Sequence, residues 1–243
     1  MKRNIKLIIE YDGTDFVGWQ RQPNGRSVQE EIEKTLSTVT RESITITGAG
    51  RTDSGVHARG QVANFFTEKS LTAVDFHRAL NGLLPEDIVI HEVEEIDEAF
   101  SSRYSAKVRE YRYYISLRPV AVNRKYCWQI GYRFDIEKMN RTASSILGVH
   151  DFQAFCKSDS ETEHYRCQVF ESNWACTDDM LVYTVRANRF LQGMVRALVG
   201  TMVDVGRGFT HEEDFETIKA SKNRSSAGQS APAKGLFLER VTY

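Results

Sequence analysis

Residues 48–58 read GAGRTDSGVHA and combine three glycines with an arginine, an aspartate and a histidine. Arg51 and Asp53 are two residues apart in this run, beside glycines that let a backbone approach a ligand closely. A carboxylate in a loop between rigid strands is suited to attack an electrophilic carbon or to remove a proton. The same residue types also favour an ordinary turn, and turn chemistry alone leaves both interpretations open.

The cysteines and histidines give no sign of a metal site. No two cysteines form a C-x-x-C pair, and no Cys/His cluster has the ligand spacing of zinc sites. The four cysteines are Cys127, Cys156, Cys167 and Cys176. We therefore expect no metal and interpret the cysteines as reduced, mostly structural thiols.

The elements that must position the loop follow a recognisable order in the first part of the chain. Hydrophobic periodicity predicts strands over residues 4–11, 43–48, 61–67 and 87–96. Two helices separate them, one after Ser27 and one after Thr72, because each residue opens a capping-box pattern. The resulting order, β-α-β-β-α-β, is typical of a ferredoxin-like fold.

The second part of the chain repeats this order without obvious identity. The predicted strands cover 110–117, 169–176, 180–187 and 236–243, and the predicted helices cover 136–147, 190–205 and 211–220. We predict an α+β fold with two ferredoxin-like halves, residues 1–104 and 105–243. They are expected to form one continuous, mainly antiparallel sheet with helices on one face and a central cleft.

Charge is segregated along the chain although the net charge is only −1. Eight basic residues and one acid lie between 99 and 133, whereas residues 86–98 hold seven acids and no Lys or Arg. This pattern favours a basic face and an acidic back, or else two solvated surfaces of opposite charge. Sheets of this kind also serve as non-catalytic RNA-binding platforms, so the fold alone does not select an enzyme.

The amino terminus, MKRNIKLIIEYDG, carries charges through its short apolar run. It therefore lacks the uninterrupted apolar stretch of a signal peptide, and no later segment has the length of a membrane span. We expect a cytoplasmic protein without a membrane partner.

Seven segments in order resemble the tRNA pseudouridine synthase family that modifies the anticodon stem-loop, the TruA family. They are YDGTDFVGWQRQ (11–22), SVQEEIEKTL (27–36), GAGRTDSGVHARGQVANF (48–65), RYSAKVREYRYYI (103–115), GVHDFQAF (148–155), NRFLQGMVRALVG (188–200) and SAPAKGLFLERVTY (230–243). The resemblance extends almost from end to end. The segment Asp159–Gln168 departs from the family pattern.

The resemblance implies roles for individual residues. Asp53 matches the catalytic aspartate, Tyr111 the active-site tyrosine and Arg196 the arginine paired with the aspartate. Arg51 matches an arginine near the target uridine. The basic stretch, with Arg103 and Arg109, is expected to contact RNA phosphates.

The resemblance also implies the reaction. Uridine becomes pseudouridine when the C–N glycosidic bond breaks, the uracil turns and a C–C bond forms to the same ribose, so no cofactor is required. The implied substrate is tRNA, at positions 38, 39 and 40 of the anticodon stem-loop, and the implied assembly is a homodimer. Because the carboxylate already serves this chemistry, we interpret His57 as structural. The alternatives are a non-catalytic RNA-binding protein, an isomerase acting on another RNA and, least in keeping with a single carboxylate, a glycosidase.

Overall fold

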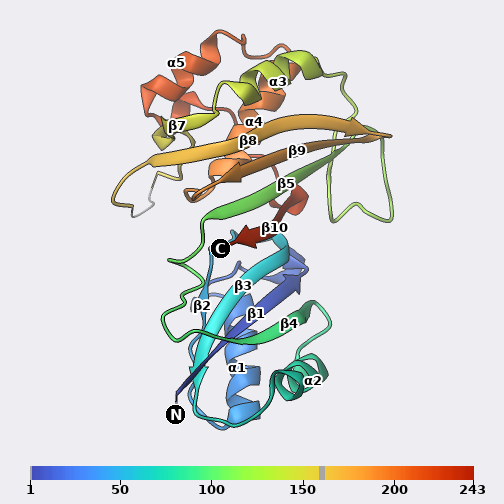
Figure 1. Cartoon of the computed structure of the whole chain (residues 1–243). Coiled ribbons are helices and arrows are strands. Elements are labelled where there is room, and N and C mark those ends of the chain that lie inside the picture. Colours follow the sequence, from blue (N-terminus) through green and yellow to red (C-terminus); the bar gives the residue numbers. More distant parts are fainter. Residues whose placement is uncertain (1, 159–161) are drawn as a thin grey trace. The chain divides into compact units, whose positions relative to one another are not determined.

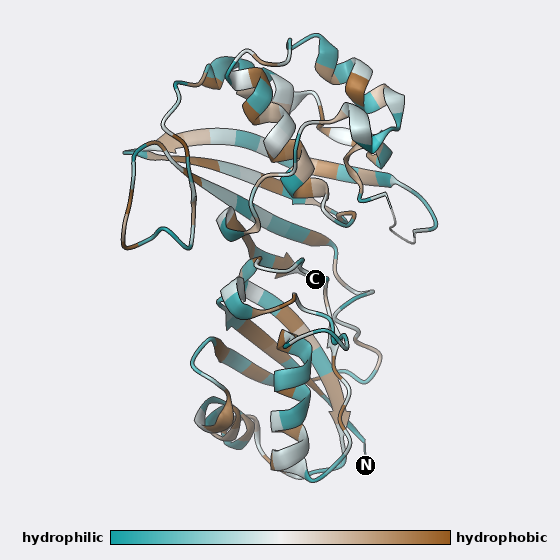
Figure 2. Cartoon of the chain, turned by 180° about the vertical axis from the view of Figure 1, so that it is seen from behind, coloured by the Kyte–Doolittle hydropathy of each residue, from teal (hydrophilic) through white to brown (hydrophobic). Residues whose placement is uncertain are grey.

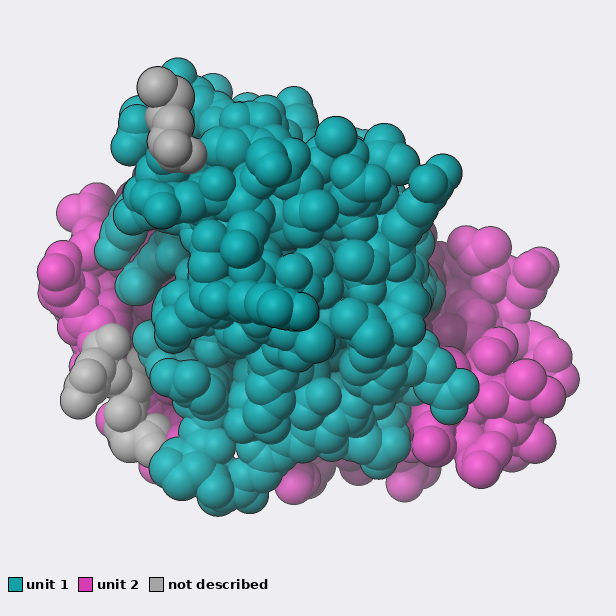
Figure 3. Space-filling view, turned by 90° about the horizontal axis from the view of Figure 1, so that it is seen from below, with its two compact units in different colours: residues 1–107, 238–243 teal, residues 108–237 magenta. Residues whose placement is uncertain are grey.

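The computed structural model describes residues 2–158 and 162–243 and confirms the α+β class (Figure 1). The chain divides into two compact units, coloured separately in Figure 3. Unit 1 comprises residues 1–107 and 238–243, and unit 2 comprises residues 108–237. These units differ from the expected halves, 1–104 and 105–243, mainly because the last six residues belong to unit 1. The division into halves and the central cleft stay predictions.

Unit 1 has the expected β-α-β-β-α-β order. Its elements are β1 (Arg3–Tyr11), η1 (Gly13–Asp15), α1 (Val28–Thr40), β2 (Thr47–Gly48), β3 (His57–Thr67), α2 (Ala73–Leu83) and β4 (Ile88–Ile96), and it also contains most of β10 (Leu236–Thr242). Ser27 caps α1 by accepting from the backbone N–H of Glu30, and Thr72 and Asp75 form a complete capping box on α2. The two helix starts predicted from the sequence are therefore confirmed.

The sheet of unit 1 is built around β1, which pairs antiparallel with β3 on one side and β4 on the other. The C-terminal residues of β10 lie beside β3. Alternate residues of β1, among them Ile5, Leu7 and Ile9, are fully buried under α1 and α2, which cover one face of this sheet (Figure 1). This burial makes β1 and β3 a rigid base for the connection between β2 and β3.

The strand predicted over residues 43–48 is much shorter in the structure, where β2 has only two residues. The backbone N–H of Ile46 donates to the Glu33 carboxylate of α1 at 3.0 Å, and that of Ile44 donates to the Ser37 hydroxyl at 3.4 Å. Side chains of α1 thus satisfy donors that would otherwise extend the β2 ladder. The sequence pattern correctly predicted that Ile44 and Ile46 are buried, but it wrongly predicted that residues 43–46 pair with a neighbouring strand.

The acidic strand β4 is largely neutralised by its neighbour β1. Lys6 pairs with Glu94, and Arg3 forms two hydrogen bonds with Glu95, at 2.7 and 3.1 Å. The first pair is directly opposite in the antiparallel register, where opposite charges stabilise a sheet. Part of the predicted acidic surface is therefore a set of cross-strand ion pairs.

Unit 2 carries the second set of elements. They are β5 (Val108–Ser116), β6 (Trp128–Gln129), α3 (Ile136–Ser144), β7 (Gly148–Asp151), η2 (Gln153–Phe155), β8 (Arg166–Thr177), β9 (Met180–Ala187), α4 (Met194–Gly206), α5 (Asp214–Ser221), η3 (Arg224–Ser226) and η4 (Ala233–Gly235). The strands β5, β9, β8 and β7 form an antiparallel series in that order, and β6 adds to β5 in parallel. Helices α3, α4 and α5 lie on one face of these strands (Figure 1). They are banded in teal and brown in Figure 2, as expected of helices that bury one side.

Helix α4 begins four residues later than the sequence pattern predicts. Gly193 has a φ of 71°, in the left-handed region, so the helix cannot extend back through it to Phe190. The apolar residues before Gly193 are packed in a loop instead of a helical turn. This shift places Arg196 in the first turn of α4. None of the helices in the described part of the chain is long and apolar enough to span a bilayer.

Close packing against α4 gives a stability prediction. A Cβ atom at Gly200, inside α4, would overlap the carbonyl oxygen of Gln229, so Gly200→Ala should reduce the free energy of unfolding by about 1–3 kcal/mol. Gly82→Ala is the matched control because this exposed glycine of α2 has open space around it. The control should raise stability by about 0.5–1 kcal/mol, since alanine favours a helix. Urea unfolding measures both changes, and an equal effect of the two substitutions would contradict the packing of α4.

Candidate active site

The loop that carries Arg51 and Asp53 consists of residues 49–56, between β2 and β3. It is tied to the sheet at its start, where Ala49 N donates to Val62 O at 2.8 Å and Gln61 Nε2 donates to Gly50 O at 2.9 Å. A turn closes its far end, because Val56 N donates to Asp53 O at 3.1 Å. The loop is therefore held by the strand on which it ends.

The segment after β1 packs over this loop and supplies further contacts. Trp19 N donates to Thr52 O at 3.1 Å, and Ser54 Oγ donates to Phe16 O at 3.2 Å. Gly18 has a φ of 116°, and a Cβ there would lie 2.6 Å from Thr52 O, so only glycine allows this close approach. Two segments that resemble family motifs, 11–22 and 48–65, thus form one structure.

A buried hydrogen bond joins these two segments beneath the loop. The hydroxyl of Tyr11 lies 2.7 Å from Oγ1 of Thr52, and the two residues are 2% and 6% exposed. Burial raises the pKa of Tyr11 well above its ordinary value, which the hydrogen bonds with Thr52 and Gln61 only partly offset. The phenol therefore stays neutral and fixes the residue next to Asp53.

His57 also supports the loop from below. It is 1% exposed, and its Nδ1 accepts a hydrogen bond of 3.0 Å from Gly13 N. Since a backbone N–H is always a donor, the neutral ring carries its proton on Nε2. Asp12 also lies 3.1 Å from Nδ1, but the same carboxylate oxygen already accepts from the backbone and hydroxyl of Thr14. This environment agrees with a structural histidine.

At the surface of this framework, Arg51 is exposed and Asp53 is half-buried. Arg51, Thr52 and Asp53 are consecutive, so the buried Thr52 separates two side chains that reach solvent to different degrees. Arg103 is also exposed, with its guanidinium 5.3 Å from the ring centroid of Tyr104. These three charged residues belong to unit 1.

The other expected site residues belong to unit 2. Tyr111 lies on β5, is 7% exposed, and packs its ring edge-to-face with Phe190 at 5.0 Å. Arg196 is half-buried, and its Nε donates to Ala231 O at 2.7 Å. Arg109 donates to Asn188 O at 2.7 Å. Because Asp53 is in unit 1, its pairing with Arg196 and Tyr111 stays a prediction.

Sequence reasoning missed the segment that orients Arg196. Ala231 N donates to Arg196 O at 2.9 Å, so backbone and side chain of Arg196 both bind Ala231. The adjacent Pro232 O accepts from the hydroxyl of Tyr113 at 2.8 Å. Burial raises the pKa of Tyr113 well above its ordinary value, and the nearby charge of Arg196 opposes this rise. The S-A-P run at 230–232 marked this segment only as a family motif.

The basic stretch of the sequence is partly paired. Arg112 binds Glu110 at 3.0 Å, and Arg118 binds Asp179. Fewer than eight cations of this stretch can therefore contact another anion without breaking an ion pair.

The segment that departs from the family pattern is only partly described, because residues 159–161 lie outside the described residues. After them, Arg189 donates to Thr162 Oγ1 at 3.1 Å and lies 3.1 Å from Nε2 of His164. These contacts bring the end of the altered segment to the loop that precedes α4. Elsewhere in the described residues, no three His, Cys, Asp or Glu side chains are grouped so as to hold a metal ion.

Comparisons with known proteins agree over nearly the whole chain. A family model described as tRNA pseudouridine synthase matches residues 7–105 and 142–243. The tRNA pseudouridine synthase A of Acetivibrio thermocellus is 43% identical over 99% of this chain and 100% of that protein. The protein of the same name from a Thermoanaerobacter species is 41% identical over 99% of this chain and 100% of that protein. The one from Bacillus pumilus is 40% identical over 98% of this chain and 98% of that protein.

The buried Tyr11–Thr52 hydrogen bond can be tested by a double-mutant cycle. Tyr11→Phe and Thr52→Val each leave a buried hydroxyl without its partner, and each should reduce the free energy of unfolding by about 1–3 kcal/mol. The double variant should lose less than the sum, because no hydroxyl is then left behind. Tyr104→Phe, at a side chain that is 79% exposed, should leave stability unchanged. Urea unfolding measures all four, and strictly additive losses would rule out the interaction.

Proposed function

Because this chain belongs to the tRNA pseudouridine synthase family, we propose that it converts uridine to pseudouridine in the anticodon stem-loop of tRNA, at positions 38, 39 and 40. The chain is an RNA pseudouridine synthase by family, and its similarity to relatives named tRNA pseudouridine synthase A supports tRNA as the substrate. The single structural observation that carries the proposal is the anchored loop 49–56, which presents Asp53 half-buried beside the exposed Arg51.

Asp53 is the proposed catalytic carboxylate. Isomerisation needs a group that either attacks the ribose or removes a sugar proton, and an ionised carboxylate can do both. The reaction retains the uracil, so it requires a loop that keeps its geometry while the base turns. The hydrogen bonds at Ala49, Gly50 and Thr52 hold the loop before the reacting group, and the bond from Val56 N to Asp53 O holds it after that group.

Arg196 and Tyr111 are the proposed partners of Asp53. The bond from Arg196 Nε to Ala231 O fixes the plane of the guanidinium, whose fork matches a carboxylate. Arg196 also lies in the first turn of α4, where the helix dipole disfavours a cation and favours an anion nearby. A carboxylate partner relieves that unfavourable placement. Tyr111 offers a ring to stack on the uracil and a hydroxyl for the proton that leaves C5.

The remaining arginines are proposed to bind the RNA. Arg51 is exposed next to Asp53 and is suited to stack on bases or to fill the gap left by an extruded uridine. Arg103 and Arg109 are proposed to contact phosphates, which would help offset the cost of extrusion, about a few kcal/mol. With tRNA as substrate, we place the enzyme in the cytoplasm. We propose that it acts as a homodimer whose two subunits share one RNA.

The catalytic role of Asp53 predicts a separation of chemistry from binding. Asp53→Asn should bind tRNA within a few fold of wild type but form no detectable pseudouridine. Asp178→Asn is the matched control, because Asp178 occupies an exposed turn with a φ of 52°, which asparagine also tolerates. Chemical mapping of pseudouridine on a tRNA transcript measures both variants. Normal product from Asp53→Asn would remove the aspartate from the mechanism.

Mapping on total RNA with the wild-type enzyme tests the substrate separately. Modification confined to positions 38–40 of tRNA is the expected result. Modification of ribosomal RNA alone would assign the same chemistry to another substrate.

Phosphate contacts predict a steep dependence of tRNA affinity on salt. Lys125→Ala removes an exposed cation of the basic stretch and should make the slope of log K against log salt shallower by about 1. The charge-neutral double variant Arg118→Ala/Asp179→Ala removes a surface ion pair and should leave the slope unchanged. Filter binding at salt concentrations from about 50 to 200 mM measures the slopes. A flat response of the wild type would exclude the basic stretch from binding.

A further inference from the structure

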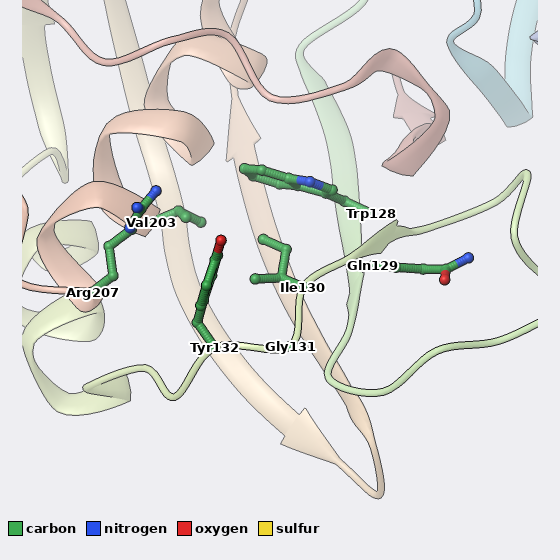
Figure 4. Close-up of a pocket in the computed structure, with 7 residues that line it drawn as sticks. All are labelled: Trp128, Gln129, Ile130, Gly131, Tyr132, Val203 and Arg207. Carbon is green, nitrogen blue, oxygen red and sulfur yellow. The ribbon is translucent and has the colours of Figure 1, made fainter.

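Unit 2 contains a cavity of about 360 Å³ that the proposed chemistry does not use (Figure 4). Its walls come from the segment around β6 and from the C-terminal end of α4, and they include Trp128, Tyr132, Val203 and Arg207. The volume is in the range of small-ligand sites. Arg207 is eleven residues beyond Arg196, about 16 Å along the helix axis, so the cavity is at the opposite end of α4 from that arginine.

The cavity is held open by backbone pairing on both sides. Trp128 pairs with Ile115 of β5, and Ile130 N donates to Ser116 O at 2.9 Å. Beyond Tyr132, Asp135 N donates to Gly206 O at 2.8 Å and ties the segment to the end of α4. A Cβ at the exposed Gly131 would meet nothing within 4 Å, so the cavity is open to solvent on that side.

Aromatic rings and one guanidinium dominate its chemistry. Arg207 lies 5.2 Å from the ring centroid of Tyr132 and 5.6 Å from that of Phe209. Tyr132 is 63% exposed and Phe209 is 78% exposed, although both are large apolar rings. Trp128 is half-buried and stands edge-to-face on Tyr113 at 6.4 Å. Trp128 and Tyr132 thus line the cavity together with Arg207, and Phe209 lies against Arg207 outside the lining. Such a set of rings beside a guanidinium suits an unstacked base.

The polar groups around the cavity favour the same ligand class. The amide of Gln129 makes two hydrogen bonds with the backbone of Val120, at 3.0 and 3.4 Å, and points away from the cavity in Figure 4. Arg207 is the charged residue of the lining, and it forms an ion pair of 3.7 Å with Asp204, so a phosphate bound there would share the guanidinium with that carboxylate. A flat ligand with an anionic group fits this set better than an apolar peptide, because the cation then faces a phosphate.

We propose that this cavity binds an unpaired nucleobase of the RNA substrate, other than the target uridine. The base stacks on Trp128, with Tyr132, whose ring stands across that of Trp128 in Figure 4, at its edge, and Arg207 contacts the neighbouring phosphate. The exposed rings of Tyr132 and Phe209, which both lie against Arg207, form the rim. This inference rests on the proposed function only in taking RNA as the ligand. The site would give the enzyme a second contact with single-stranded RNA, away from the reacting nucleotide.

Trp128 provides a direct readout of binding. Trp19 and Trp174 are 3% and 4% exposed, so the half-buried Trp128 is the tryptophan that a bound base can reach. Titration with a tRNA transcript should quench its fluorescence, and the quenching should be absent in Trp128→Phe. Quenching that persists in this variant would contradict the assignment.

Substitution of the rim tests the contribution to affinity. Tyr132→Ala/Phe209→Ala and, separately, Arg207→Gln should weaken tRNA binding about 5- to 100-fold, the range for one stacked base, with the effect in KM more than in kcat. Arg207→Lys, which keeps the charge but not the flat guanidinium, should show a smaller loss. Phe170→Ala is the matched control on the same unit, at a ring that is 47% exposed, and should bind as wild type.

The outcomes separate this inference from the proposed function. Unchanged affinity in the rim variants would overturn the nucleobase site even if the wild type forms pseudouridine. If the rim variants instead change the sedimentation of the free protein, the exposed rings of Tyr132 and Phe209 contact a second copy of the chain, and the proposal fails. A wild type that binds tRNA through this rim but forms no pseudouridine would sink the proposed function and leave the nucleobase site standing.

Discussion

The geometry of the candidate site depends on the buried contact between Tyr11 and Thr52. A loop of eight residues has many conformations, and its bonds to the backbone of Val62 and to the side-chain amide of Gln61 fix only the first two residues. The Tyr11 hydroxyl fixes the residue that precedes Asp53, in surroundings where an unpaired hydroxyl is costly. A neutral phenol holds this position without adding charge beside the carboxylate. The residues after Thr52 are then held by the bond from Ser54 Oγ to Phe16 O and by the turn from Val56 N to Asp53 O.

Much of this arrangement could be predicted from local patterns. The capping residues Ser27 and Thr72 set the helix starts because their side chains bond within the next turn, and a short-range signal contains all that is needed. The predicted strand at 43–48 failed for the opposite reason. Glu33 and Ser37 of α1 accept from its backbone, and such partners become visible only when the helix has packed. Likewise, the left-handed backbone of Gly193 sets the start of α4, and the apolar sequence around this glycine gives no sign of that conformation.

The site shows the same division between local and long-range information. The run at 48–58 identified Arg51 and Asp53 as neighbours in one loop, because they are neighbours in the sequence. The bond from Arg196 to Ala231, and that from Tyr113 to Pro232, join residues 35 and 119 positions apart. No periodicity predicts such contacts. Family resemblance indicated that the segment matters, but only packing shows that it orients a guanidinium.

The place of β10 in unit 1 has a consequence for how the protein is made. Glu239 binds Arg59 across 180 residues of sequence, and Thr242 accepts from the backbone of Lys107. The edge of β3 beside loop 49–56 is therefore covered by a strand that leaves the ribosome after all of unit 2. Until then, the nascent first unit exposes the part of this edge that β2 does not pair, which favours aggregation. Because synthesis runs from the N-terminus to the C-terminus, the sheet beneath the loop stays incomplete until unit 2 has been translated. The open edge of β3 must be protected during most of that time.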